Sequence, residues 1–173
     1  MDFKKISKKR EIQGAKDIGG RVHPASGARW HTKGDFSNQF IHVEDKFFCS
    51  NNNSSDTYSI SLDVLHKVEK EAFSIGKTPV LKFGLYNARQ TYNNKDFAVI
   101  NRDHIIKPIN YSRENQVSTS KKSYLVRINQ LEDIYINNND ILLHLTFTKA
   151  NKVFVVMKWE YFLENMDLII EEN

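Results

Sequence analysis

The chain has 173 residues, of which 40% are hydrophobic and 27% are charged. This is enough apolar material to form the core of about one domain, and it excludes a wholly disordered chain. The net charge is +4, but residues 1–35 carry nine basic and four acidic residues, whereas residues 160–173 carry five acidic residues and no basic one. A basic N-terminal region favours a polyanionic partner.

The cysteine count and the hydropathy pattern exclude further classes. A single cysteine, Cys49, allows neither an intramolecular disulfide bond nor a thiolate zinc cluster. The N-terminus is charged and lacks the apolar stretch of a secretory signal, and no apolar run approaches the ~20 residues that span a bilayer. We therefore expect a cytoplasmic protein without a membrane partner.

The first third of the chain predicts a helix, a loop and a strand. Residues 3–18 form a basic helix with sparse apolar anchors, and Gly19-Gly20 ends it. Residues 21–34 are rich in turn-forming residues and predict a loop, with a short strand at residues 21–23. Apolar and polar residues then alternate from residue 38 to residue 49, which is the period of a strand.

The rest of the chain predicts an alternation of helix and strands. A helix capped by Ser59 or Ser61 runs to Ile75 at helical apolar spacing, and the polar residues 107–122 predict a mobile loop. The other expected elements are strands at 78–84, 97–100, 123–128, 141–148 and 152–158, with a turn at 150–151, and a closing helix at 159–170.

These elements predict an α/β fold in which helices flank a mixed central β-sheet. We expect one domain over residues 1–173, with a β-rich C-terminal extension at about 123–170. Its alternating apolar residues allow the extension to lengthen the sheet, to cover a sheet edge or to form a homodimer face.

Four residues near the N-terminus form a candidate catalytic site. Glu44 and Lys46 project to the same side of the predicted strand, about 7 Å apart, and a hairpin would bring Asp35 beside them. Two neighbouring carboxylates bind a hard divalent cation such as Mg²⁺, and Glu11 on the basic helix can add a third acid. This set suits phosphodiester hydrolysis. Taken alone, however, Glu-x-Lys on a strand is also typical of a solvated ion pair.

The order of these residues resembles that of the PD-(D/E)XK nuclease superfamily, and within it the Holliday junction resolvases of archaeal and phage type and allied phage endonucleases. The matching residues are Glu11, Arg21, Ser26-Gly27-Ala28, Asp35 and Glu44-Asp45-Lys46. A helix followed by a strand over residues 58–81 also resembles the element pair that follows the catalytic strand in that superfamily. The resemblance covers roughly residues 5–105 and implies a restriction-endonuclease-like core there.

The resemblance also implies a role for each matching residue. Asp35, Glu44 and the backbone carbonyl of Asp45 would hold Mg²⁺, for which Mn²⁺ can substitute. Lys46 would orient or help to deprotonate the attacking water. Glu11 would complete the acidic site or coordinate through water, and Ser26 would lie near the scissile phosphate.

The function that the resemblance implies is hydrolysis of DNA phosphodiesters by a metal-dependent endodeoxyribonuclease. The expected substrate is branched DNA, cut by a homodimer that supplies two symmetric sites, in the host cytoplasm if the chain is of phage origin. Two alternatives remain open. The same fold can act on another double-stranded DNA substrate, such as a flap, a duplex end or a restriction-like site, or it can bind DNA without cutting it.

Basic and aromatic residues near the predicted site are candidates for DNA contact. The candidates are Lys8, Lys9, Arg10, Arg21, Ser26, Arg29, Trp30 and Lys33. If these residues are functional, they contact DNA phosphates. If they are not, the basic residues belong to a solvated start of the chain and Trp30 lies in the core. His42 shares the predicted face of Glu44, which allows a role at the metal or the phosphate.

Asp45 departs from the superfamily pattern, in which the residue between Glu and Lys is usually apolar or small. Its side chain is expected on the opposite face of the strand, towards the core. Because a buried unpaired carboxylate is costly, we expect a pairing with Lys82 or another base on a neighbouring strand, partial exposure or a raised pKa.

Overall fold

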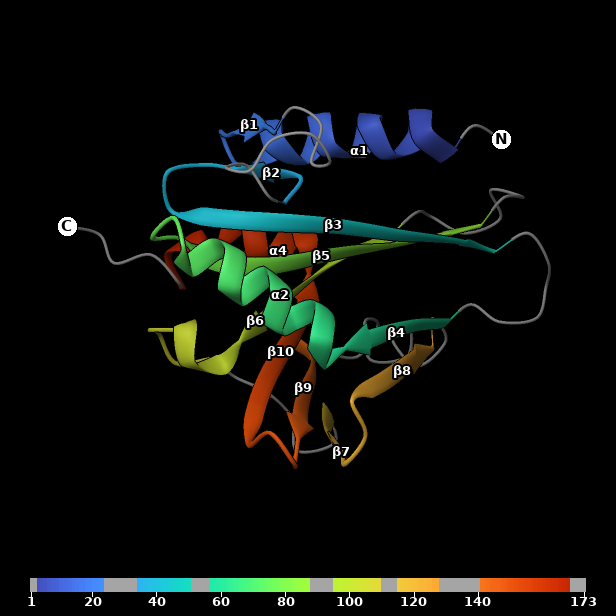
Figure 1. The fold of residues 1–173 in the computed structure, drawn as a ribbon, viewed down its shortest axis with the longest axis vertical. Coiled ribbons are helices and arrows are strands. Elements are labelled where there is room, and N and C mark those ends of the chain that lie inside the picture. Colours follow the sequence, from blue (N-terminus) through green and yellow to red (C-terminus); the bar gives the residue numbers. More distant parts are fainter. Residues whose placement is uncertain are drawn as a thin grey trace.

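The computed structural model describes residues 3–23, 34–50, 57–87, 95–109, 115–127 and 141–168. An eight-stranded mixed sheet forms its centre (Figure 1), in the order β1-β2-β3-β5-β6-β10-β9-β7. β3 and β5 run parallel, as do β7 and β9, and the other neighbours are antiparallel. The strands are β1 (Arg21–Val22), β2 (Phe36–Ser37), β3 (Ile41–Ser50), β5 (Thr78–Asn87), β6 (Lys95–Asn101), β7 (Gln116–Thr119), β9 (Ile141–Phe147) and β10 (Lys152–Lys158).

Helices cover both faces of this sheet. α1 (Phe3–Asp17) and α4 (Trp159–Glu164) contribute to the apolar cluster on one face, and α2 (Leu62–Phe73) contributes to the cluster on the other. Two 3-10 turns, η1 (Arg102–His104) and η3 (Met166–Leu168), complete the helical elements described. A two-stranded sheet of β4 (Thr57–Ser61) and β8 (Ser123–Arg127) lies beside the main one. The predicted α/β class with a mixed central sheet is confirmed.

α1 is held to the sheet by a narrow buried stripe. Arg10 and Gly14 lie one helical turn apart on its buried face, and Ile18 follows at the same spacing. The ring of Phe36 from β2 packs directly over Gly14, where an added Cβ would lie 2.4 Å from a ring carbon. The absence of a side chain at Gly14 thus allows the close approach of α1 to β2.

β3 presents different chemistry to the two faces. Ile41 and Val43 point into the α1 cluster, and strand alternation directs Asp45 to the same face. His42, Glu44 and Lys46 project to the α2 face by the same alternation. The parallel pairing with β5, which places Glu44 opposite Leu81 and Asp45 opposite Lys82, fixes this arrangement at the centre of the sheet.

Three expectations for the later elements need correction. Ser59 lies within β4, and Ser61 occupies the N-cap position of α2 without a side-chain capping bond. The polar segment 107–122 contains the strand β7, which pairs with β9, so it is not a continuous loop. The last α-helix ends at Glu164 and gives way to a 3-10 turn.

The C-terminal extension lengthens the central sheet. β10 pairs with β6 and with β9, and the turn at residues 148–151 joins the last two strands as a hairpin. Asn151 adopts the positive φ of 50° that such a turn requires. Among the described helices, none combines the length and apolar character needed to cross a membrane.

Candidate active site

Asp35 lies at the entry of β2 and faces the centre of β3. Its N–H donates to the carbonyl of Val43 (3.0 Å), and its own carbonyl accepts from the N–H of His23 (3.0 Å). β2 pairs with β3 so that Phe36 lies opposite Val43, and the hydrogen bond from Asp35 to Val43 holds Asp35 beside the centre of β3. The charge of Glu44 acts on the Asp35 carboxylate and raises its pKa, so the two carboxylates lie close enough to interact.

The approach to Asp35 depends on a glycine. Gly34 has φ +78°, and a Cβ there would lie 2.3 Å from the imidazole of His42. Any larger residue would therefore be strained by its backbone conformation and would also collide with a buried ring. The His42 ring thus lies directly beneath the turn that delivers Asp35 to the site.

The Asp35 carboxylate is in an environment that disfavours its charge. Its Oδ2 accepts a hydrogen bond from the backbone N–H of Asp45 (2.7 Å). Burial and the neighbouring charge of Glu44 nevertheless raise the pKa of Asp35 to about 6, with a smaller contribution from Glu11, and outweigh the opposing effects of that hydrogen bond and of Lys46. A bound cation would relieve this repulsion.

Glu44 is a buried carboxylate that two lysines neutralise. Its Oε1 lies 2.6 Å from Nζ of Lys46 and 3.4 Å from Nζ of Lys67 on α2. Burial raises the pKa of Glu44, but the hydrogen bond and charge of Lys46, with the charge of Lys67, outweigh burial and hold it below its usual value. Burial lowers the pKa of Lys46, but its bond to Glu44 and the nearby acids raise it above its usual value. Lys46 is therefore an ammonium group at neutral pH.

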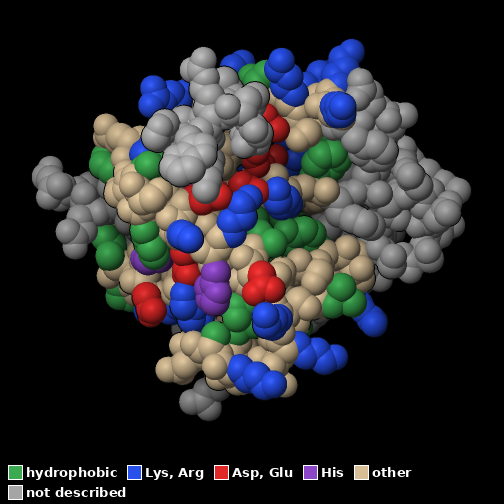
Figure 2. Space-filling model, viewed as in Figure 1, with side chains coloured by type: hydrophobic (Ala, Val, Ile, Leu, Met, Phe, Trp, Pro, Cys, Tyr) green, Lys and Arg blue, Asp and Glu red, His purple; other side chains and the backbone are tan. Residues whose placement is uncertain are grey.

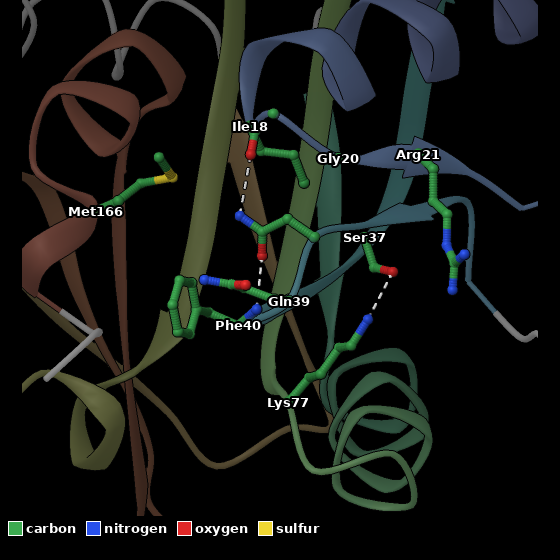
Figure 3. Close-up of a pocket in the computed structure, with 10 residues that line it drawn as sticks. Ile18, Gly20, Arg21, Ser37, Gln39, Phe40, Lys77 and Met166 are labelled. Carbon is green, nitrogen blue, oxygen red and sulfur yellow. Dashed lines mark hydrogen bonds between the residues drawn. The ribbon is translucent and has the colours of Figure 1, made fainter. Parts of the chain in front are cut away.

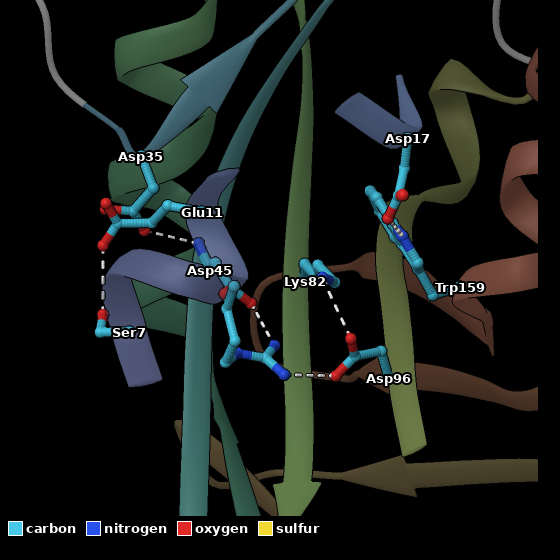
Figure 4. Close-up of polar contacts among 9 residues, drawn as sticks. Ser7, Glu11, Asp17, Asp35, Asp45, Lys82, Asp96 and Trp159 are labelled. Carbon is cyan, nitrogen blue, oxygen red and sulfur yellow. Dashed lines mark hydrogen bonds and ion pairs between the residues drawn. The ribbon is translucent and has the colours of Figure 1, made fainter. Parts of the chain in front are cut away.

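Glu11 reaches the site from α1, on the other side of Asp35. Figure 4 shows its carboxylate beside that of Asp35, with Ser7 Oγ donating to Glu11 Oε1 over 3.1 Å. The space-filling view shows acidic and basic side chains side by side between α1 and α2 (Figure 2). The four predicted catalytic residues thus come from three elements and converge on one surface.

Asp45 faces away from this surface and belongs to a buried ion network. Arg10 donates to both of its carboxylate oxygens, at 2.9 Å from Nε and 2.5 Å from Nη2, and also contacts Asp96 at 2.6 Å (Figure 4). Lys82 lies 3.0 Å from the other oxygen of Asp96. Burial raises the pKa of Asp45 even though the charge of Arg10 opposes this shift.

Asp45 is paired and its pKa is raised, as expected, but its direct partner is Arg10 on α1 and not Lys82 or another base on a neighbouring strand. Arg10 is only 6% exposed and is bound by two carboxylates. This position does not fit the DNA contact predicted for Arg10, since its donors point to the interior. The helical periodicity of α1 explains why Arg10 is buried while Lys8 and Lys9 are exposed, because residue 10 falls on the stripe that faces the sheet.

A second buried group borders the site on the α2 side. His42 is 1% exposed, and its Nε2 lies 3.9 Å from Oε2 of Glu71. Neither ring nitrogen of His42 has a hydrogen-bond partner among the described residues. Burial, aided by the charge of His23, lowers the pKa of His42 to about 4, so the ring is neutral at pH 7.

The oxygen donors at the site fit Mg²⁺. Within the described ranges, no three His, Cys, Asp or Glu side chains are close enough to hold a metal ion by themselves. Mg²⁺ requires less, because it commonly binds one or two carboxylates and keeps water or substrate phosphate as its other ligands. The Asp35 and Glu44 carboxylates supply such a pair. Strand geometry also directs the Asp45 carbonyl to the same side as its N–H, towards Asp35.

The other predicted contact residues fall into two groups. Lys8 and Lys9 are exposed on α1, and Arg21 is exposed on β1. Ser26, Arg29, Trp30 and Lys33 lie outside the described residues. Of the three exposed residues, Lys8 and Lys9 thus lie on the same helix as Glu11, and Arg21 lies on the strand that pairs with β2.

Lys67 and Glu71 are the site residues that the sequence analysis missed. They lie one helical turn apart on α2, and Lys67 Nζ is 3.9 Å from Glu71 Oε1. Their spacing of four residues is a recognisable helical ion pair. What could not be read from it is that this turn of α2 lies over Glu44, which depends on the crossover between β3 and β5.

Comparison of the chain with protein-family models, curated proteins and solved structures finds no match. The residues and geometry described above therefore carry the functional proposal.

Proposed function

We propose that this protein is a metal-dependent endodeoxyribonuclease with a restriction-endonuclease-like core that hydrolyses phosphodiesters of branched DNA, in the manner of a Holliday junction resolvase. The observation that carries the proposal is the Asp35–Glu44 pair. The charge of Glu44 acts on Asp35 and raises its pKa, and Lys46 Nζ lies 2.6 Å from Glu44 Oε1. A solvated surface ion pair would not require a partly buried second acid whose pKa is raised to about 6.

Each residue has a role that follows from its environment. Mg²⁺ held by Asp35, Glu44 and the Asp45 carbonyl would polarise the phosphoryl oxygen and lower the pKa of water. Lys46 is protonated, so it orients water or stabilises negative charge on the phosphate and does not act as the base. Lys67 adds a second positive charge next to Glu44. Glu11 adds negative charge beside Asp35, which strengthens the attraction for a cation.

The surroundings of the site support a nucleic-acid substrate. Lys8 and Lys9 on α1 and Arg21 on β1 present exposed positive charge on two elements that adjoin the site, and such residues bind phosphates with release of counterions. The preference for branched DNA and the homodimeric state are proposed from the resemblance to the junction resolvases. A two-fold dimer supplies the two symmetric cuts that resolution of a junction needs.

Cleavage of a labelled four-way junction in Mg²⁺ tests this function. Wild-type protein is compared with Asp35→Asn and Glu44→Gln, each of which keeps the size of the side chain and removes one ligand charge. Asp63→Asn is the matched control, because Asp63 is a 70% exposed carboxylate on α2 that pairs only weakly, at 3.7 Å, with Lys122. We expect at least a 100-fold loss of cleavage for the two site variants and no loss for the control.

The same assay on a flap, a plain duplex and a duplex end determines the substrate. Faster cleavage of the junction than of the other three supports the resolvase assignment, whereas faster cleavage of a flap or a duplex supports the alternative nuclease. Cleavage that survives both Asp35→Asn and Glu44→Gln would contradict the site. Binding without a product on all four substrates would show a non-catalytic DNA-binding module.

A further inference from the structure

A pocket of about 810 Å³ opens beside the candidate active site, between the end of α1, the β2–β3 turn and η3 (Figure 3). Its volume lies within the range of small-molecule sites, which is ~300–1,000 Å³. None of the described residues that line it is acidic, although acids are frequent elsewhere in the chain. The lining residues are Ile18, Gly19, Gly20, Arg21, Ser37, Asn38, Gln39, Phe40, Lys77 and Met166.

One end of the pocket gathers donors for an anion. Lys77 Nζ donates to Ser37 Oγ over 2.9 Å, and the Arg21 side chain extends towards the same hydroxyl (Figure 3). Ser37 itself is buried and its hydroxyl is also bonded to His23 Nε2 at 2.8 Å, so the two cations are the groups that can bind an anion. Burial, aided by the charge of Arg21, lowers the pKa of Lys77, and no acidic side chain lies among the described residues that line the pocket. A phosphate would compensate both charges and accept hydrogen bonds from both groups.

The other end of the pocket is apolar. Phe40 is a large aromatic side chain that is 43% exposed, and Ile18 and Met166 line the pocket with it. Met166 lies across the pocket from Arg21 in Figure 3. An exposed aromatic ring and a thioether form a surface on which a flat base can stack. The neighbouring amide of Gln39, which is exposed, offers a donor and an acceptor to a base edge.

The strand connects this pocket to the catalytic carboxylates. Ser37 follows Asp35 by two residues, so their Cα atoms lie at most about 7 Å apart. Ser37 lies opposite His42, and Phe36 lies opposite Val43. The anion-binding end of the pocket thus lies two residues along the chain from Asp35.

We propose that this pocket binds one unpaired nucleotide of the DNA strand, next to the phosphate that is cut. Arg21 and Lys77 hold its phosphate, and its base lies against Phe40 and Met166. The position relative to a cut phosphate rests on the proposed nuclease function. The pocket explains a preference for branched DNA, since a junction or a fork supplies unpaired or easily unstacked nucleotides that a continuous duplex does not.

Fluorescence anisotropy in EDTA tests the pocket without any cleavage. The probes are a labelled duplex with a single-stranded overhang and the same duplex with blunt ends, titrated with the full chain. The variants are Arg21→Gln, Lys77→Gln and Phe40→Ala. The control is Lys149→Gln, which removes an exposed charge in the β9–β10 turn, at the far end of the sheet. Circular dichroism confirms that each variant is folded.

We expect the overhang probe to bind more tightly than the blunt duplex. Arg21→Gln and Lys77→Gln should each weaken binding of the overhang about 10- to 100-fold, as loss of a charged hydrogen bond does. Phe40→Ala should weaken it about 5- to 100-fold through lost stacking. Lys77→Gln and Phe40→Ala should change binding of the blunt duplex less than ~3-fold, Arg21→Gln should weaken the blunt duplex less than it weakens the overhang, and Lys149→Gln should change neither.

Three results would overturn the pocket assignment: equal weakening of both probes, competition by free dTMP, and unchanged binding in the variants. Equal weakening of both probes would show general attraction to phosphates without an unpaired nucleotide. Competition by free dTMP at the affinity of the overhang would show a mononucleotide site instead of a DNA-strand site. If the overhang binds through Arg21, Lys77 and Phe40 but no substrate is cut, the pocket assignment stands and the proposed nuclease function is contradicted.

If the protein cuts DNA but these variants bind the overhang as tightly as wild type does, the nuclease function stands and the pocket assignment is contradicted.

Discussion

Glu44 and Asp45 are adjacent acids on β3 with opposite environments. Glu44 faces α2 and a partly open surface, where the 45% exposed Lys46 and the 57% exposed Lys67 contact it. Asp45 is 3% exposed and is bound by Arg10, which is itself buried. One peptide unit therefore separates a carboxylate whose partners can exchange with solvent or ligand from one whose partners are fixed.

The difference shows how one strand can carry an acid for chemistry and another for structure. Mobile lysines leave Glu44 able to exchange its partners for a cation, whereas the planar guanidinium of Arg10 binds both oxygens of Asp45. The buried network of Arg10, Asp45, Asp96 and Lys82 fastens α1 to the sheet, and α1 carries Glu11. Variants on the two faces of β3 should therefore separate loss of folding from loss of activity.

The largest effect on stability is expected for Arg10→Met. Removal of the guanidinium leaves Asp45 as a buried charge without its main partner, which typically costs about 3–5 kcal/mol. Urea denaturation should show this loss, with Lys9→Met as the control because Lys9 is exposed on the neighbouring position of α1. A loss below about 1 kcal/mol would show that the charge of Lys82 compensates Asp45 on its own.

Lys46→Met should affect activity strongly and stability little. The Lys46–Glu44 contact involves a half-exposed lysine, and such pairs contribute about 0–1 kcal/mol to folding. Loss of a positive group that contacts the reacting phosphate or water should lower cleavage about 10²–10³-fold. Single-turnover cleavage and urea denaturation of the same preparation measure the two effects. Lys122→Met, at an 82% exposed position, should change neither; equal cleavage by Lys46→Met and wild type would contradict the assigned role.

Asp35→Asn should change the pH dependence of stability in the absence of metal. Because the folded-state pKa of about 6 lies above the ordinary aspartate value of 3.8, the stabilising contribution of protonated Asp35 is complete below pH ~4 and is lost as the pH rises through ~6. The Asn variant avoids this loss and keeps an acceptor for the Asp45 N–H. The difference in free energy of unfolding between Asp35→Asn and wild type should therefore be about 1–2 kcal/mol more favourable to the variant at pH 7.5 than at pH 4, after allowance for solvent screening.

Urea denaturation in EDTA at the two pH values measures the Asp35 effect. Asp63→Asn is the control, because Asp63 is largely exposed and should show the same difference from wild type at both pH values. A gain for Asp35→Asn that is larger at pH 4 than at pH 7.5 would contradict the raised pKa.

The smallest effect is expected for Lys67→Gln. Its Nζ is 3.4 Å from Glu44, longer than the 2.6 Å contact of Lys46, and the side chain is 57% exposed. We expect a two- to fivefold fall in cleavage and a stability change within about 0.5 kcal/mol. Measured beside Lys46→Met, this variant ranks the two lysines; a larger effect at Lys67 than at Lys46 would reverse their proposed roles.

The sequence predicted the elements that have a strong local pattern. The alternation in β3 and the apolar stripe of α2 each reflect one buried face, so periodicity alone located them. The faces of Glu44 and Asp45 follow from the same alternation. The strand β7 and the early end of α4 were missed, because a polar edge strand and a short helix depend on neighbours that the local pattern does not contain.

By itself, the sequence determined which residues of β3 share a face, and it nominated Asp35, Glu44, Lys46 and Glu11 as one set. Only the tertiary structure decided which partners complete that set. The crossover between β3 and β5 brings Lys67 over Glu44, and the docking of α1 buries Arg10 against Asp45. These contacts join residues more than 20 positions apart, and a local period of two or 3.6 residues carries no information about such distances.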